Sequence, residues 1–195
     1  MSSCIWLIRH GETAWSRELR HTGRTDIPLT DLGIEQAAAA GSKLSKTAAA
    51  LVLCSPLGRA RDTAAIADLV VDEYTEDLLE WDYGAWEGLT TQEIRLTLGD
   101  PTWVVWNHPI PAGQTPGEQP AQVAARANRV ITRAQQQLEE GGDCVLVAHG
   151  HVLRILTATW LGLPPNDGRL FGLDPARVSA LGFEHEQRVI LQWNS

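Results

Sequence analysis

Short apolar runs alternate with longer amphipathic stretches along this chain. The runs at 4–9, 49–54 and 143–148 are nearly continuous, which is typical of parallel strands buried on both faces. Between them, apolar residues recur every three or four positions, as they do on one face of a helix. Strands that alternate with helices predict a parallel sheet with right-handed crossovers.

Four helices are expected between and after these strands. They cover 30–46 with Thr30 as N-cap, 55–68 with Pro56 in the first turn, 123–138 before Gly141-Gly142, and 151–161. The tail, 177–183 and 188–193, predicts an antiparallel hairpin that turns through 185–187. The sequence therefore predicts a three-layer α/β/α sandwich with a mainly parallel sheet and one antiparallel strand.

The segment 81–119 is the irregular part of the chain. It is rich in proline and tryptophan and shows no clear helical or strand period. We interpret it as a lid-like insertion over the sheet edge. A chain of 195 residues suits one domain, so 1–195 is expected to be a single domain that carries this lid.

Composition and net charge limit the kinds of partner that this chain is expected to bind. A net charge of -8 at pH 7 argues against nucleic acid or an anionic membrane as partner. The longest apolar run is too short to span a bilayer, and the first apolar run is interrupted too early for a signal peptide. Cys4, Cys54 and Cys144 are expected to be buried free thiols. These features indicate a cytoplasmic protein that acts on a small molecule, and they leave monomer and homodimer open.

Two histidines carry the candidate chemistry. His10 follows the first apolar run and His149 follows a later one, and each is followed by a glycine. The carboxyl ends of parallel strands share one edge of the sheet, where such sheets bind ligands. Arg9 beside His10 suggests that the ligand is an anion, most simply a phosphate. The pattern therefore predicts phosphoryl transfer through a histidine.

Further groups support this chemistry. A neutral imidazole attacks through one nitrogen while the other holds its proton on a carbonyl, which Gly11 is expected to expose by a tight turn. The start of the helix at 55–68 adds N–H groups and a second cation, Arg59 or Arg61. These two arginines cannot share a helix face, and spacing alone does not choose between them. A metal held by the histidines with Glu12 and Glu80, with His149 and His151 as a possible pair, is the alternative, but Arg9 and an arginine of this helix would repel a divalent ion.

Seven motifs follow one another along the chain: Arg9-His10-Gly11-Glu12-Thr13, Thr22-Gly23, Leu29-Thr30-x-x-Gly33, Ser55-Pro56-x-x-Arg59-Ala60-x-x-Thr63-Ala64, Leu79-Glu80-x-x-x-Gly84-x-Trp86-Glu87-Gly88, Gly117-Glu118 and His149-Gly150-His151-x-x-Arg154. Their order resembles that of the histidine phosphatase superfamily, whose fold is phosphoglycerate mutase-like. The similarity covers nearly the whole chain and is strongest to short bacterial acid phosphatases and sedoheptulose bisphosphatases.

The resemblance implies a role for each matching residue. His10 would be phosphorylated, Glu80 would donate a proton to the leaving oxygen, and Arg9, Arg59 and His149 would hold the phosphate. The implied substrate-binding set also includes Ser16, His21, Thr22, Gly23 and Gly150. Ser16 departs from the family pattern, in which an asparagine often helps to hold the phosphate. His151 is expected to be a helix-start or supporting group, and Arg126, Arg129 and Arg133 a solvated helix face.

The implied activity is hydrolysis of a small phosphomonoester, with no cofactor and no metal. The alternative is a cofactor-dependent phosphoglycerate mutase, and a third class is an inactive phosphate-sensing module. The chain lacks the longer insertions and tail of those mutases. The segment 81–119 also has few cations, Arg95 and His108, which favours small or apolar-bodied monophosphates.

Overall fold

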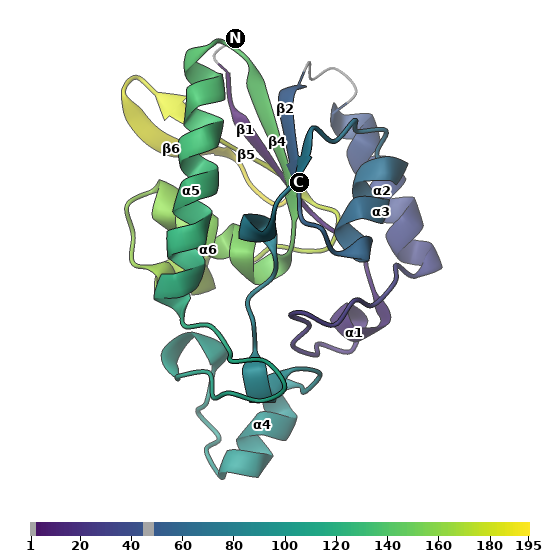
Figure 1. Cartoon of the computed structure of the whole chain (residues 1–195), viewed down its shortest axis with the longest axis vertical. Helices are drawn as coiled ribbons and strands as arrows, with labels where there is room; N and C mark the ends of the chain where they lie inside the picture. Colours follow the sequence, from purple (N-terminus) through teal and green to yellow (C-terminus); the bar gives the residue numbers. More distant parts are fainter. Residues whose placement is uncertain (1–2, 45–48) are drawn as a thin grey trace.

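A six-stranded sheet forms the centre of the computed structural model, which describes residues 3–44 and 49–195 (Figure 1). The strands are β1 (Ile5–Arg9), β2 (Ala49–Cys54), β3 (Glu73–Tyr74), β4 (Asp143–Ala148), β5 (Val178–Glu184) and β6 (Gln187–Gln192), in the order β3-β2-β4-β1-β5-β6. The pairs β1–β4, β2–β4 and β2–β3 are parallel. Since β5 pairs antiparallel with both β1 and β6, β5 alone runs against the other strands described, as the sequence predicts.

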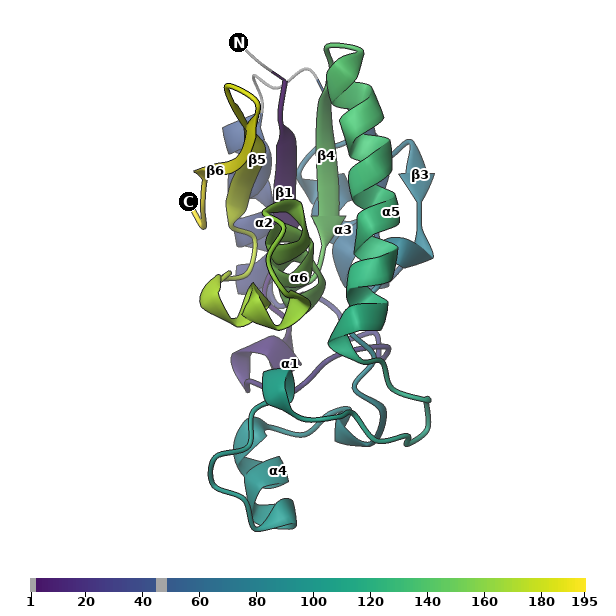
Figure 2. The ribbon, with the colours of Figure 1, turned by 90° about the vertical axis from the view of Figure 1, so that its left-hand side faces the viewer.

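Helices cover both faces of this sheet, so the predicted three-layer sandwich is confirmed (Figure 2). Helices α2 and α3 lie on one face, and α5 and α6 lie on the other. The α-helices are α1 (Ala14–Arg17), α2 (Asp31–Leu44), α3 (Gly58–Ile66), α4 (Thr91–Leu98), α5 (Pro120–Glu139) and α6 (Gly150–Trp160). Short 3-10 helices occur at η1 (Glu76–Leu78), η2 (Gly84–Trp86), η3 (Val105–Asn107) and η4 (Pro165–Leu170). None of these helices is long and apolar enough to cross a membrane, over the residues described.

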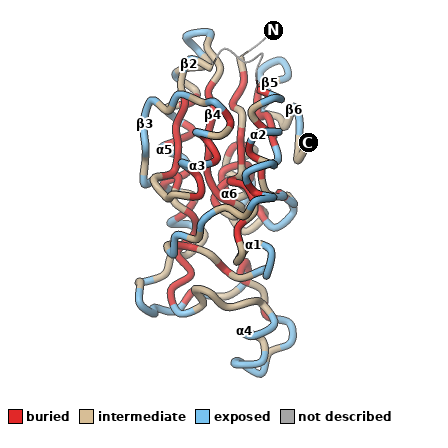
Figure 3. Tube along the Cα trace, turned by 90° about the vertical axis from the view of Figure 1, so that its right-hand side faces the viewer, coloured by how far each residue is buried: buried red, intermediate tan, exposed pale blue. Residues whose placement is uncertain are grey.

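Successive residues of each central strand face two separate cores. Ile5 and Leu7 of β1 belong to the core under α5 and α6, whereas Ile8 belongs to the core under α2 and α3. In β4, Leu146 belongs to the core under α5 and α6, and Val147 belongs to the core under α2 and α3. Both faces are buried (Figure 3), which explains why these strands are continuous apolar runs rather than alternating ones.

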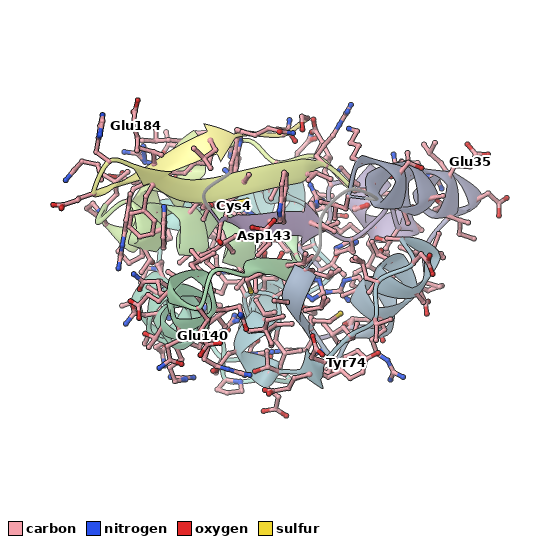
Figure 4. The ribbon with its side chains drawn as sticks, turned by 90° about the horizontal axis from the view of Figure 1, so that it is seen from above. Cys4, Glu35, Tyr74, Glu140, Asp143 and Glu184 are labelled. Atoms are coloured by element: carbon pink, nitrogen blue, oxygen red, sulfur yellow. The ribbon has the colours of Figure 1, made fainter. Side chains whose placement is uncertain are left out.

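The register between β1 and β4 is fixed where both strands begin. The Asp143 carboxylate accepts from the Cys4 backbone N–H at 2.9 Å and from Trp6 Nε1 at 3.1 Å, and Figure 4 shows Cys4 and Asp143 as neighbours. At the other end of the strands, Arg9 stands opposite Ala148. The residues that follow, His10 and His149, therefore leave the sheet at the same level.

The start of one predicted helix needs correction. Helix α3 begins at Gly58 rather than at 55, because Asp26 accepts from the backbone N–H of Gly58 at 2.6 Å and of Arg59 at 3.4 Å. Asp26 therefore occupies the helix start that was expected to serve a ligand. Helix α2 is described as far as Leu44, and the last two positions predicted for it, 45–46, lie outside the described residues. Thr30 caps α2 as predicted, with Oγ1 accepting from Gly33 N at 3.1 Å.

The segment 81–119 lies beyond the carboxyl ends of β1 and β4 (Figure 1). It is less irregular than predicted, because it contains α4. This helix begins with a capping box in which Thr90 and Glu93 bond to each other's backbone N–H. It ends at Gly99, whose φ of 66° suits a residue without a side chain.

Candidate active site

His10 and His149 lie side by side at the carboxyl edge of the sheet. Their ring centroids are 5.1 Å apart and the rings cross at 61°. The backbone N–H of His10 donates to Ala148 O at 2.9 Å, which continues the pairing of β1 and β4 past the strand ends. The repeated pattern of apolar run, histidine and glycine thus brings the two imidazoles together, as predicted.

His10 has the protonation state that a nucleophile needs. Its Nδ1 lies 2.7 Å from Gly11 O, and a carbonyl only accepts, so Nδ1 carries the proton and Nε2 keeps its lone pair. Burial, followed by the charges of Arg59 and Arg9, lowers the pKa of His10 well below its ordinary value. The ring is therefore neutral near pH 7 and can attack through Nε2.

Gly11 is needed for close packing and not for a left-handed turn. A Cβ atom on Gly11 would lie 2.3 Å from the carbonyl oxygen of Gly33 in α2. The Gly11 N–H also donates to Thr63 Oγ1 in α3 at 3.0 Å. The expected tight turn is thus replaced by an anchor to two helices, which holds the Gly11 carbonyl under His10.

Arg9 lines the cavity in front of His10 and carries one unpaired donor. This cavity has a volume of about 280 Å³, and Arg9, His10 and Gly150 are among the residues that line it. One Arg9 guanidinium nitrogen donates to Leu173 O, while Nε is buried and has no hydrogen-bond partner. The backbone of Gly150 packs beside this guanidinium, since a Cβ atom there would lie 3.4 Å from Arg9 Nε. A bound anion would supply the missing acceptor.

Arg59 and His149 lie behind His10 and do not line the cavity. Both have 0% exposure, and Arg59 Nε donates to His149 Nδ1 at 3.1 Å. The other His149 nitrogen, Nε2, therefore carries the proton and donates to Ser55 Oγ at 2.7 Å. The rest of the Arg59 guanidinium donates to backbone carbonyls of the loop at Thr22, Gly23 and Thr25.

The structure separates Arg59 from Arg61. Arg61 is exposed and its guanidinium lies 5.1 Å from the ring centroid of Tyr74, on the outer side of α3. Arg59 is buried and lowers the pKa of His10 through its charge. The direct phosphate contact expected of Arg59 and His149 stays a prediction, because both use their donors on the protein here.

The carboxyl group of Glu80 is held at the start of α6. Oε1 accepts from Trp81 N at 2.9 Å and from Val152 N at 2.8 Å, and Oε2 accepts from His151 N at 3.0 Å. Glu80 also lines the cavity. Since a carboxyl oxygen has two acceptor sites, Oε2 keeps one position at which it can carry a proton.

Arg126 supports the Glu80 loop, a role that the sequence interpretation missed. It is buried rather than part of a solvated face, and it donates to Glu80 O at 3.0 Å. It also pairs with Glu118, with Nε 2.9 Å from Oε1. Glu118 in turn accepts from Asp82 N at 3.0 Å. The Gly117-Glu118 motif is thus part of a clamp that fixes the backbone next to Glu80.

The predicted substrate-binding residues divide into two groups. Ser16, His21 and Thr22 line the cavity, whereas Gly23 does not. The Gly23 N–H donates to Glu87, at 2.9 Å to Oε1 and 3.0 Å to Oε2. The Ser16 hydroxyl lies 2.9 Å from Thr13 N in the capping box of α1, so it is partly committed to the backbone.

Several residues of the cavity wall were not predicted. His151 lines the cavity instead of only supporting the helix start, and the Tyr83 hydroxyl is hydrogen-bonded to its Nδ1. Arg154, one turn later on α6, lies 4.7 Å from the ring centroid of Trp106. The three-residue spacing of His151 and Arg154 was a signal that both share one helix face. The other unpredicted wall residues are Leu19, Arg20, Thr91, Val104, Val105 and Leu173.

Within 3–44 and 49–195, no three His, Cys, Asp or Glu side chains gather in a way that could hold a metal ion. Near His10 the concentrated charges are cationic instead, since Arg9 and Arg59 both act on its ring.

Comparison with known proteins agrees with this geometry. The chain is 44% identical over 186 residues to an acid phosphatase of Mycobacterium tuberculosis, with 94% of this chain and 88% of the relative covered. It is 34% identical to sedoheptulose 1,7-bisphosphatase of Saccharomyces cerevisiae, with coverage of 82% and 68%. The solved structure of open reading frame Rv3214 from Mycobacterium tuberculosis matches with a TM-score of 0.91 at 41% identity, covering 100% of this chain and 98% of that one. Residues 5–195 match the model of the histidine phosphatase superfamily (branch 1), and the chain belongs to this family.

Proposed function

We propose that this phosphatase hydrolyses small phosphomonoesters in two steps through a phosphohistidine on His10. The observation that carries the proposal is a neutral His10 with a free Nε2, beside a buried Arg9 Nε that has no partner. A nucleophile next to an unsatisfied cation suits attack on a phosphate group. The similarity to an acid phosphatase and to a sedoheptulose 1,7-bisphosphatase supports hydrolysis of a phosphate ester.

The carboxyl group of Glu80 donates a proton in the first step and accepts one in the second. In the first, His10 Nε2 forms a bond to phosphorus while the ester P–O bond breaks, and the proton on Glu80 passes to the leaving oxygen. In the second, Glu80 takes a proton from water as that water attacks phosphorus, and the P–N bond breaks. Arg9 balances the charge on the phosphoryl oxygens in both steps.

Arg59 and His149 would support the same intermediate from behind. Burial and then the Arg59 charge lower the pKa of His10 and so favour its neutral form, and the hydrogen bond from Arg59 Nε orients the His149 ring. For His149 to touch the phosphate, its Nε2–H must exchange Ser55 Oγ for a phosphate oxygen. Both residues are proposed to stabilise phosphate, as the resemblance implies.

The segment 81–119 is proposed to act as a lid within a single domain. It contributes Tyr83, Val104 and Trp106 to the cavity wall, whereas its two candidate cations, Arg95 and His108, do not line the cavity. The part of the wall that this segment contributes carries no cation, which favours small esters with one phosphate. The three cysteines are buried and free, which supports a reducing compartment such as the cytoplasm.

Hydrolysis and positional transfer can be separated directly. With 3-phosphoglycerate and a trace of bisphosphorylated primer, we expect free phosphate to appear faster than 2-phosphoglycerate, with little dependence on primer. A panel of phosphorylated metabolites, assayed for both phosphate and isomerised product, provides the measurement. Primer-dependent isomerisation that outruns phosphate release by about tenfold, which is about 1.4 kcal/mol in barrier, would favour the mutase.

Glu80→Gln is expected to slow alkyl phosphates by about 10²–10⁴-fold in the first step, since general acid catalysis contributes that much. Aryl phosphates leave without a proton and should lose much less in that step. Single-turnover rates for one ester of each kind give the comparison. Glu76→Gln is the matched control, because Glu76 is exposed and does not line the cavity. An equal loss for both esters would show that Glu80 is not the leaving-group acid.

A further inference from the structure

Two histidines line the cavity without a part in the proposed steps. His21 precedes the loop that Arg59 holds, and His151 is in the first turn of α6. Their rings are nearly parallel, at 4°, with centroids 6.4 Å apart. His21 is 7% exposed and packs edge-on against Tyr83 and Trp103, while the His151 ring lies 4.9 Å from that of Trp106. Packing therefore fixes both rings.

His21 presents an acceptor to the cavity. Its Nδ1 lies 2.8 Å from the Leu89 carbonyl oxygen, which can only accept, so the proton is on Nδ1. Burial lowers the pKa of His21, so the ring is neutral near pH 7 and Nε2 carries a lone pair. No described residue donates to this Nε2.

His151 presents a donor. Burial, followed by the charges of Glu80 and Glu87, raises the pKa of Tyr83 well above its ordinary value, so the phenol keeps its proton. Among the residues described, His151 Nδ1 is the one acceptor in reach of that hydroxyl. Burial and the Arg154 charge lower the pKa of His151, so this ring is neutral too. Its proton is then on Nε2, which has no acceptor in the described part of the chain.

One neutral acceptor beside one neutral donor matches a hydroxyl group, which both donates and accepts. A carboxylate only accepts and would meet the lone pair of His21, and an ammonium only donates and would meet the N–H of His151. We propose that His21 and His151 form a hydroxyl-binding subsite, so that preferred substrates are phosphomonoesters of polyols or sugars. The proposal rests on the proposed phosphatase function and specifies the alcohol part of its substrate.

Glycerol 3-phosphate and 1-propyl phosphate provide the test, since both are three-carbon alkyl esters and differ only in hydroxyl groups. Two neutral hydrogen bonds predict a preference for glycerol phosphate of about tenfold or more in kcat/KM. His21→Phe removes the acceptor and Tyr83→Phe removes the group that sets the His151 tautomer. Each variant removes one of the two hydrogen bonds and should lower the ratio of kcat/KM values by about fivefold.

Two further variants guard against a loss that is only structural. His21→Gln keeps an acceptor of similar reach and should retain most of the preference. His108→Gln alters a lid histidine that does not line the cavity and should leave the ratio at the wild-type value. Thermal unfolding checks that each variant is folded.

The outcomes separate this proposal from the phosphatase function. If wild type hydrolyses p-nitrophenyl phosphate but does not distinguish the two alkyl esters, the proposed hydroxyl-binding subsite is contradicted and the proposed phosphatase function is retained. An unchanged ratio in His21→Phe leads to the same conclusion. If none of the three esters releases phosphate, both proposals fail.

Discussion

Replacing His10 by alanine is expected to lower kcat by about 10⁴–10⁶-fold, as the loss of a covalent nucleophile does in other enzymes. No second group can take over. His149 is adjacent, but both of its ring nitrogens are bonded, to Arg59 and to Ser55. The Cys54 thiol is buried, and burial raises its pKa to about 12, so it is not a thiolate near pH 7.

Steady-state phosphate release from p-nitrophenyl phosphate gives the rate. His108→Ala is the matched control, because it removes an imidazole from the same protein outside the cavity. Removal of a partly exposed side chain of this kind should lower the rate by about twofold or less. Activity of His10→Ala within tenfold of wild type would remove His10 from the mechanism.

Arg59→Ala is expected to lower the rate by about 10²–10³-fold, comparable with the loss of one oxyanion donor. Arg61→Ala should be mild, because Arg61 lies against Tyr74 on the outer side of α3. The Arg59 variant should also unfold at a lower temperature, since carbonyls of the 22–25 loop lose their donor. Rates are therefore compared below both unfolding temperatures. A larger loss in Arg61→Ala would contradict the assignment.

The pH dependence separates the charge of Arg59 from its structural role. After burial, the Arg59 charge is the largest cause of the lowered pKa of His10. In Arg59→Met that pKa should rise toward its ordinary value, and His10 would then be protonated at a higher pH. The acid limb of kcat/KM should therefore move to higher pH than in wild type. Titration of the substrate affects wild type and Arg59→Met equally, so it does not contribute to the difference between their pH profiles. If the acid limb of the variant lies at the same pH as that of wild type, the Arg59 charge does not act on His10.

The sequence predicted the paired histidines because their signal is local. Each follows a strand that is buried on both faces, and parallel strands in register bring their ends together. Arg59 was chosen over Arg61 only by resemblance, since helix spacing treats them alike. The structure distinguishes the two arginines because Arg59 donates hydrogen bonds to backbone carbonyls of the 22–25 loop.

The predictions from sequence failed where contacts between residues far apart in the chain determine the local structure. Helix α3 begins late because Asp26, far back in the chain, caps Gly58. His151 and Tyr83 meet only where the segment 81–119 packs on α6, so neither could be placed in the cavity from sequence. Helix α4 is different, because its Thr90–Glu93 capping box and its Gly99 terminator were local signals that could have predicted it.

The most direct test of the account is to trap the phosphoenzyme. In Glu80→Gln the first step with an aryl phosphate needs no acid, while the second step has lost its base, so the intermediate should accumulate. After alkaline quenching, we expect one radiolabelled phosphate on the peptide that contains His10, labile to acid and stable to base. Label on Cys54 or Ser55, or hydrolysis with no labelled protein at any time point, would contradict the account.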